Sequence, residues 1–439
     1  MNLDLSKIKK VFFIGIGGIG ISAIARMMLM EGKQVFGSDI SASGITTELE
    51  NLGANITLGQ AVDLIPKGVD LIVYSIAIPK YDPEFFKKLQ SLGLKLLNYP
   101  EILGIVTADK YAIAVSGTHG KTTTTAMIAK ILIDAGRDPS VIVGSLLKDY
   151  KSNLVVGKSE FFVVEACEYE RSFLNIKPKI LVITNIEPDH LDYYKDIEDI
   201  KNAFWQLILQ TENVVIYNGN DTNISTLARE YKGEAVDYIK YLEKVPKLSV
   251  PGEHNRMNAA AALAVADILG IKEEISQKSL AEFSGTWRRL EKKGETKEGT
   301  IIYDDYAHHP TEIKASLQAL RELYPKSEKK ITVLFQPHLY SRTKALFDDF
   351  AKSFKDADKV LLLPIYFARE AKDESVSSEK LVNAINKTIN KEGDDARAYP
   401  DFKSAENAVV ALKLGSKDIF VTMGAGEAYK ISDKVLKFT

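Results

Sequence analysis

Short apolar runs alternate along the chain with longer segments in which apolar residues return every three or four positions. The short runs predict buried strands, and the longer segments predict amphipathic helices. Because strands that alternate with helices are typical of parallel sheets with crossover connections, we expect an α/β fold. The strands we expect are residues 11–14, 34–37, 71–74, 111–115, 161–164, 180–184, 214–217, 300–303, 331–335, 360–363 and 419–422.

The composition excludes several classes of protein. Lys and Arg number 57 against 59 Asp and Glu, so the chain has no broad positive field and nucleic acid is not an expected partner. The single cysteine, Cys167, excludes an intramolecular disulfide framework and a cysteine-based zinc cluster. No apolar run reaches the roughly 20 residues of a membrane span. We therefore expect a cytoplasmic, unprocessed protein without stable membrane insertion, and no feature indicates its oligomeric state.

A first glycine loop, residues 15–20 (the Gly15 loop), follows the first expected strand and precedes a helix. Its glycines satisfy G-x-G-x-x-G, a pattern in which the backbone approaches a pyrophosphate at the positive end of a helix. Asp39 ends the next strand, where a carboxylate can accept hydrogen bonds from a ribose. Taken alone, the loop fits a nicotinamide dehydrogenase, another diphosphate nucleotide, or a tight turn without a ligand.

A second glycine loop, residues 117–122 (the Lys121 loop), reads Gly-Thr-His-Gly-Lys-Thr between a strand and a helix. In this setting backbone N–H groups surround a triphosphate, the lysine neutralises phosphate charge and the threonine hydroxyl binds Mg²⁺. The loop departs from G-x-x-x-x-G-K-[ST] because Val115 occupies the first glycine position. A helix start rich in Lys and Thr is the alternative, but the strand–loop–helix context favours an ATP site.

The two loops together carry more information than either loop alone. A dehydrogenase needs one dinucleotide and no ATP, and a simple ATPase needs no second nucleotide domain. A ligase that joins a nucleotide-linked substrate to another molecule uses both.

Most of the six histidines stand just past the ends of expected strands, where α/β sheets bind ligands: His119, His190, His254, His308, His309 and His338. Glu165 ends a strand near the Lys121 loop, and its carboxylate suits Mg²⁺. Imidazole is not a preferred Mg²⁺ ligand, so direct and water-bridged contacts of His190 stay open. The spacing of His190, His308 and His309 gives little support for zinc.

In their order, these motifs resemble those of the Mur ligases, the ATP-dependent amino-acid-adding enzymes of peptidoglycan precursor synthesis. The resemblance spans nearly the whole chain and is nearest to the branch that adds L-alanine. It rests on residues 15–20, 117–125, 165–173, 184–190, 254–258, 288–289, 304–312 and 336–342.

The resemblance implies three α/β domains. Residues 1–108 would form a Rossmann-like domain that binds a UDP-sugar, and residues 109–292 a central P-loop domain that binds ATP. Residues 293–439 would form a second Rossmann-like domain that binds the amino acid and closes over the ATP site. The implied substrates are UDP-N-acetylmuramate, L-alanine and ATP, with Mg²⁺ as cofactor and an acyl phosphate as intermediate.

The resemblance also implies roles for individual residues. The UDP-sugar would contact Gly15, Gly17, Gly18, Gly20, Ser38, Asp39 and Ser75. ATP would contact Gly117, Thr118, His119, Gly120, Lys121, Thr122, Thr123, Asn255, Asn258, Arg289 and Asp305. Mg²⁺ would be held by Thr122, Glu165 and His190, and the amino acid by His308, His338 and Arg342. The catalytic residues would be Lys121, His190, His308 and Arg342.

Two departures from the family pattern refine this prediction. Family members that add later residues carry a carbamylated lysine, whereas residues 203–205 here read Ala-Phe-Trp, which favours the alanine-adding branch. Some relatives have Arg where this chain has Leu339, so no substrate role is transferred to that position. The alternatives are a recycling ligase that adds a whole peptide to the same nucleotide sugar, a nicotinamide dehydrogenase, and a nonenzymatic nucleotide sensor.

Overall fold

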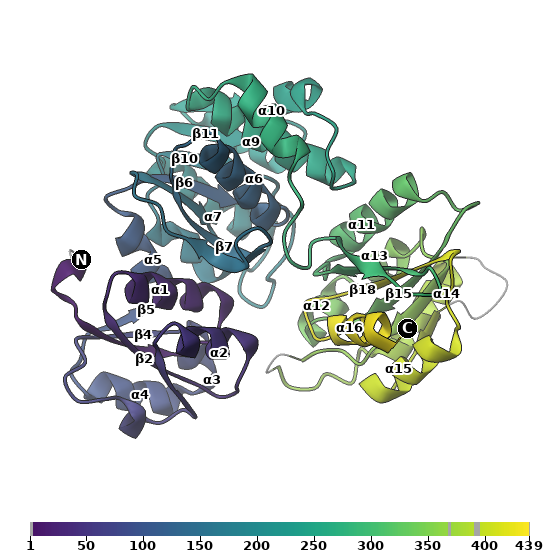
Figure 1. Cartoon of the computed structure of the whole chain (residues 1–439), viewed down its shortest axis with the longest axis horizontal. Helices are drawn as coiled ribbons and strands as arrows, with labels where there is room; N and C mark the ends of the chain where they lie inside the picture. The colour runs from purple at the N-terminus through teal and green to yellow at the C-terminus, as the bar shows by residue number, and fades with distance from the viewer. Residues whose placement is uncertain (1–2, 368–369, 390–395, 439) are drawn as a thin grey trace. The chain divides into compact units, whose positions relative to one another are not determined.

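The computed structural model describes residues 3–367, 370–389 and 396–438 and contains three separate β-sheets flanked by helices (Figure 1). The chain divides into two compact units. The first unit comprises residues 1–186, 198–244 and 260–280, and the second comprises residues 187–197, 245–259 and 281–439. Two sheets belong to the first unit and one to the second. Among the described residues, no helix combines the length and apolar character needed to cross a bilayer.

The first sheet has five parallel strands in the order β3-β2-β1-β4-β5. Its strands are β1 Lys10–Ile14, β2 Gln34–Asp39, β3 Asn55–Leu58, β4 Leu71–Tyr74 and β5 Leu96–Asn98. Its helices are α1 Ile19–Met30, α2 Gly44–Asn51, α3 Ala77–Tyr81, α4 Pro83–Ser91 and α5 Tyr99–Thr107. The three strands expected here are present. The apolar pattern missed β3 because most of its side chains are exposed, and β5 because it is very short.

The second sheet has seven strands in the order β12-β11-β10-β6-β9-β7-β8. The strands are β6 Tyr111–Ser116, β7 Ser140–Leu147, β8 Ser152–Val155, β9 Phe161–Glu165, β10 Ile180–Ile183, β11 Val214–Tyr217 and β12 Glu234–Asp237. The helices are α6 Lys121–Asp134, α7 Ile197–Gln210, α8 Thr222–Glu230, α9 Glu253–Ile268 and α10 Glu273–Ala281. The strands β7 and β8 form an antiparallel hairpin at one edge, which the sequence pattern did not predict.

The third sheet has six strands in the order β13-β14-β18-β15-β16-β17. The strands are β13 Glu291–Glu295, β14 Ile301–Asp305, β15 Lys330–Phe335, β16 Lys359–Leu362, β17 Ala396–Ala398 and β18 Asp418–Met423. The helices are α11 Pro310–Leu323, α12 Tyr340–Ala345, α13 Phe347–Ser353, α14 Ser378–Ile389, α15 Phe402–Ala411 and α16 Tyr429–Phe438. Only β13 is antiparallel to its neighbour, and the four expected strands are all present.

The central strands explain why apolar runs located the sheets so well. Every residue of β4, β10 and β14 is buried, because helices cover both faces of a parallel sheet. Such strands read as continuous apolar runs, and the chain turns polar where each strand ends. The polar residues that follow the strands therefore gather at the carboxyl edge of each sheet, where ligands bind in this fold class.

Candidate functional site

The Lys121 loop joins β6 to the first residue of α6 with a backbone that only glycine fits well. Gly117 has φ +130° and Gly120 has φ +81°. A Cβ added to Gly117 would lie 2.1 Å from the hydroxyl oxygen of Thr184, so no side chain fits there without displacing the neighbouring strand end. The loop leads into the N-terminus of a helix, where backbone N–H groups favour an anion.

Two residues after β10 hold the Lys121 loop in place. Asn185 accepts from the backbone N–H of Thr118 through its carbonyl oxygen at 2.9 Å and from that of His119 through its side-chain oxygen at 2.8 Å. The Thr184 hydroxyl donates to the His119 carbonyl oxygen at 2.5 Å. Because β10 pairs with β6 in parallel, both strands deliver their polar ends to one edge. Neither residue was assigned a role from the sequence.

Lys121 contacts a buried carboxylate. Its Nζ donates to the carbonyl oxygens of Gly117 at 2.5 Å and Thr118 at 3.0 Å, and to Glu168 Oε1 at 3.1 Å. Burial is the largest single influence and acts to lower the pKa of Lys121, but the combined effects of Glu168, Cys167 and Glu165 outweigh it, so the pKa is raised. The ammonium group therefore stays charged beside the loop, as a phosphate-binding lysine must.

Two hard oxygen donors of the first unit fit Mg²⁺. The Thr122 hydroxyl lies at the start of α6, and Glu165 ends β9, the other parallel neighbour of β6. Glu165 Oε2 accepts from the backbone N–H of Gly144 in β7 at 2.7 Å. A Cβ added to Gly144 would lie 2.6 Å from the Glu165 carboxylate, so this position needs glycine if Glu165 is to keep its place.

The Gly15 loop is anchored to the neighbouring strand ends of the first sheet. The Gly17 backbone N–H donates to Asp39 Oδ2 at 2.9 Å, and the Gly15 N–H donates to the Ser38 carbonyl oxygen at 2.8 Å. Gly15 has φ +75°, and a Cβ there would lie 3.3 Å from that of Ser75. In this structure Asp39 therefore supports the loop, at the edge where a diphosphate would bind.

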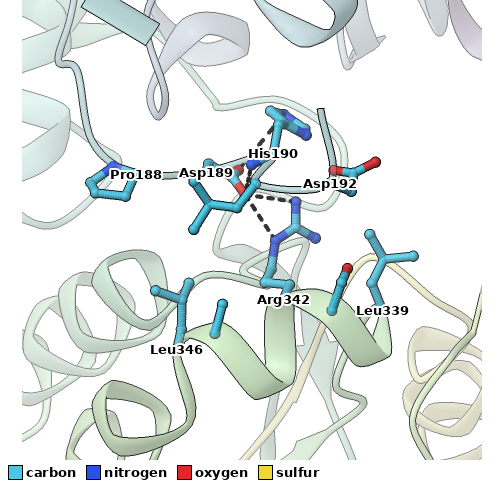
Figure 2. A pocket seen from close by; sticks show the side chains of 10 residues that line it. Pro188, Asp189, His190, Asp192, Leu339, Arg342 and Leu346 are labelled. Carbon is cyan, nitrogen blue, oxygen red and sulfur yellow. Dashed lines mark hydrogen bonds and ion pairs between the residues drawn. The ribbon is translucent and has the colours of Figure 1, made fainter. Parts of the chain in front are cut away.

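In the second unit, an ion pair links the segment after β10 to α12. Arg342 donates to Asp189 Oδ1 from Nε at 3.0 Å, and its Nη2 lies 2.9 Å from the same oxygen (Figure 2). Burial acts to raise the pKa of Asp189, but His190 and Arg342 hold it well below the usual range. The backbone N–H of His190 also donates to Asp189 Oδ1, at 2.8 Å, and His190 has an unusual φ of +54°.

A cavity of about 120 Å³ lies beside this ion pair. Figure 2 shows the Arg342 side chain rising from α12 toward Asp189, with Leu339 and Leu346 on either side. The cavity is lined by Pro188, Asp189, His190, Leu191, Asp192, Leu339, Ser341, Arg342, Ala345 and Leu346. It thus combines one guanidinium group and carboxylates with apolar walls, a combination that suits a small amino acid.

Two histidines of the second unit are neutral at neutral pH. Burial lowers the pKa of His308 to about 4 despite the opposing Glu312 carboxylate. Burial, together with His308 and Arg342, lowers the pKa of His338 to about 3. His308 Nδ1 lies 3.0 Å from the Tyr306 carbonyl oxygen and 3.3 Å from Glu312 Oε2. Since both are acceptors, Nδ1 carries the proton and Nε2 can accept one.

Four further predicted residues are buried or partly buried in the second unit. Asn255 donates to the Pro251 carbonyl oxygen at 2.6 Å and accepts from Asn258 at 3.4 Å. Burial raises the pKa of Asp305 to about 6, although Ser316 donates a hydrogen bond to it. The Arg289 guanidinium lies 5.1 Å from the centre of the Tyr306 ring.

The predicted residues thus form two groups. The first unit contains Gly15, Gly17, Gly18, Gly20, Ser38, Asp39, Ser75, Gly117, Thr118, His119, Gly120, Lys121, Thr122, Thr123 and Glu165. The second contains His190, Asn255, Asn258, Arg289, Asp305, His308, His338 and Arg342. The residues we missed are Gly144, Glu168, Thr184, Asn185 and Asp189. Four of them stand in motifs that were recognised, whereas Gly144 had no signal because β7 and β9 are not consecutive strands.

Comparison with known proteins gives consistent matches along the chain. Residues 10–111 match "Mur ligase family, catalytic domain", residues 115–247 "Mur ligase middle domain", and residues 288–426 "Mur ligase, glutamate ligase domain". A relative from Caldanaerobacter subterraneus named UDP-N-acetylmuramate–L-alanine ligase is 41% identical, covering 100% of this chain and 99% of its own. One of the same name from Clostridium tetani is 42% identical over the full length of both chains.

Solved structures agree with these matches. The crystal structure of UDP-N-acetylmuramate-alanine ligase from Thermotoga maritima has a TM-score of 0.81 and 28% identity, covering 98% of both chains. A murein peptide ligase from Psychrobacter arcticus has a TM-score of 0.71 at 22% identity, which supports the fold alone. The predicted three-domain α/β fold is confirmed, and the chain belongs to the Mur ligase family.

Proposed function

We propose that the chain is an ATP-dependent ligase that joins L-alanine to the carboxylate of UDP-N-acetylmuramate in peptidoglycan precursor synthesis, in the cytoplasm. One observation carries the proposal: a phosphate loop with a charged, partly buried lysine occurs in a chain that matches alanine-adding ligases over its full length. The likeness to a murein peptide ligase at 22% identity supports only the fold, whereas the relatives at about 40% identity are named as alanine-adding ligases.

The ATP end of the reaction belongs to the Lys121 loop. A carboxylate is a poor acyl donor because oxide is a poor leaving group, so transfer of the γ-phosphoryl group to it gives an acyl phosphate that an amine can attack. Lys121 would neutralise phosphate charge, and Thr122 and Glu165 would hold Mg²⁺. When bound, the cation supplies further neutralisation of the transferred phosphoryl group. His190 would contribute to a second cation, directly or through water.

The amino acid end belongs to the cavity beside Arg342. A guanidinium group has five N–H donors, and the contacts with Asp189 and His338 use three of them. Arg342 would therefore bind the substrate carboxylate while Asp189 keeps the guanidinium oriented. His338 would support this site. His308 Nε2 would take a proton from the ammonium group, because only the neutral amine attacks the acyl phosphate.

The remaining assignments follow the family pattern. The Gly15 loop, Ser38, Asp39 and Ser75 would bind the UDP-sugar, and Asn255 and Asn258 the adenine. Arg289 and Asp305 would complete the nucleotide site. The domain boundaries at residues 108/109 and 292/293, and the closing of the last domain over ATP, stay predictions. Closing would protect the acyl phosphate from water.

A substrate panel tests the proposed function. Purified protein with ATP, Mg²⁺ and UDP-N-acetylmuramate should release ADP with L-alanine, and much less with the tripeptide that a recycling ligase would use. In Lys121→Ala, ADP release should fall at least about a hundredfold because an electrostatic donor to the phosphates is lost, while UDP-sugar binding persists. The control is Lys130→Ala, which removes another lysine of the same helix, α6, and should leave ADP release unchanged. Normal turnover in Lys121→Ala would refute the ATP-site assignment.

Replacement of Arg342 tests the amino acid site. Arg342→Lys keeps the charge but removes the planar fork, so the KM for L-alanine should rise about tenfold or more. The KM values for ATP and UDP-N-acetylmuramate should change less than about threefold, since these ligands are assigned elsewhere. Lys344→Ala is the matched control, because Lys344 lies on the same helix with its side chain 59% exposed. An unchanged KM for L-alanine in Arg342→Lys would contradict the assignment.

The lowered pKa of the partly buried His308 predicts acid sensitivity. Its pKa of about 4 lies below the ordinary value of 6.5, so between these values only the unfolded chain binds the proton. The contribution of the neutral His308 side chain to the free energy of unfolding is therefore complete above pH 6.5, and it is lost as the pH falls toward 4. We expect the free energy of unfolding, measured by urea titration, to fall between pH 7 and pH 5 in the wild type and in His308→Asn. The fall should be about 1–2 kcal/mol smaller in His308→Asn, because the variant has no imidazole at this position to protonate. Equal losses in both proteins would show that His308 does not resist protonation.

A further inference from the structure

A buried polar contact joins the first sheet's helix α1 to the β7–β8 hairpin of the second sheet, within the first unit. Asn153 of β8 is fully buried. Its Nδ2 donates to the carbonyl oxygen of Ile19, and its Oδ1 accepts from Arg26 Nη1 at 2.7 Å. One amide side chain therefore binds both the backbone and a side chain of α1.

Arg26 completes this contact with a third element. Only 3% of the arginine is exposed, and its Nε and Nη2 donate to the Glu48 carboxylate of α2 at 2.9 and 2.7 Å. Its Nη1 also donates to Ser22 Oγ at 3.1 Å. We call Arg26, Glu48 and Asn153 the brace. A bidentate arginine–carboxylate pair fixes direction as well as distance, whereas apolar packing alone would tolerate sliding.

Each end of the brace meets one of the proposed ligand sites. Ile19 is the first residue of α1 and belongs to the Gly15 loop. The hairpin, through the Gly144 N–H, holds the Glu165 carboxylate. A second contact reinforces the arrangement: a Cβ on Gly20 would lie 2.6 Å from the Tyr99 ring, so α1 also packs closely on the start of α5.

We propose that Asn153 and Arg26 are positioning residues that fix the distance between the diphosphate loop and the metal-binding carboxylate. The inference rests on the proposed function, because the substrate carboxylate is attached to the nucleotide sugar and must meet the γ-phosphate of ATP. Each nucleotide binds its own loop, so the brace contributes to neither affinity. It contributes to the geometry of the reacting atoms, for which an error of about 1 Å can reduce the rate about a hundredfold.

The most selective variant is Asn153→Asp. It keeps the shape and the acceptor for Arg26, but it loses the donor to Ile19 and sets a carboxylate oxygen against a carbonyl oxygen. We expect kcat at saturating substrates to fall about tenfold or more, while the separately measured Kd values for ATP and UDP-N-acetylmuramate change less than about threefold. The matched control is Asn386→Asp in the second unit, which loses a similar donor to the Ala396 carbonyl oxygen and should keep its kcat.

Three results with the wild type or a folded Asn153→Asp protein would overturn the proposal, and a fourth applies if that variant does not fold. The first is a folded Asn153→Asp protein whose kcat stays within about threefold of the wild type, less than the misplacement of reacting atoms would cause. The second is a fall in kcat matched by an equal weakening of one nucleotide's Kd, which would indicate a local defect. The third is a wild type that forms no ADP from the complete mixture, which refutes the proposed function and this inference with it.

If Asn153→Asp does not fold, Glu48→Gln is the deciding variant, because the Glu48 side chain is 41% exposed. A loss of kcat in Glu48→Gln supports the brace, whereas an unchanged kcat overturns the proposal.

Discussion

The carboxyl ends of parallel strands are the constraint on which this structure depends. A buried parallel strand satisfies its backbone groups until it ends, and the N–H groups of the next loop and helix then face outward. The Lys121 loop uses this edge between β6 and α6, and the strand ends on either side supply the groups around it: Thr184 and Asn185 after β10, and Glu165 at the end of β9. The glycine at position 117 follows from this crowding, because the Thr184 hydroxyl occupies the space of a side chain.

Both cations assigned to substrates are held by buried carboxylates. Lys121 contacts Glu168, and Arg342 contacts Asp189. Separating the charges of a buried ion pair is strongly destabilising. Each carboxylate therefore keeps the Lys121 or Arg342 side chain charged and in position when no substrate is bound. Under the proposed assignments, an incoming phosphate or carboxylate would meet a charge that is already oriented, which lowers the ordering cost of binding. Arg26 and Glu48 form a similar pair, in which the nearly buried guanidinium also donates to Asn153 rather than to a proposed ligand site.

The sequence predicted those parts of the molecule that depend on neighbours along the chain. Apolar runs located the central strands, and strand–glycine–helix patterns located both loops. The antiparallel hairpin β7–β8 was not predicted, because its first strand pairs with β9 across an intervening segment. Gly144 and Asn153 were missed for the same reason, since their partners Glu165 and Ile19 are distant in the chain. Asp189 was missed although its neighbour His190 was assigned, because only the fold brings Arg342 to it.

The central claim is that the carboxylate of the nucleotide sugar is activated by phosphoryl transfer before the amine attacks. UDP-N-acetylmuramate labelled with ¹⁸O in that carboxylate tests it directly, by mass spectrometry of the phosphate released during turnover with ATP and L-alanine. The account predicts one labelled oxygen in each phosphate, because the carboxylate oxygen that attacks phosphorus leaves with it. Unlabelled phosphate released together with ADP and the amide product would contradict the account.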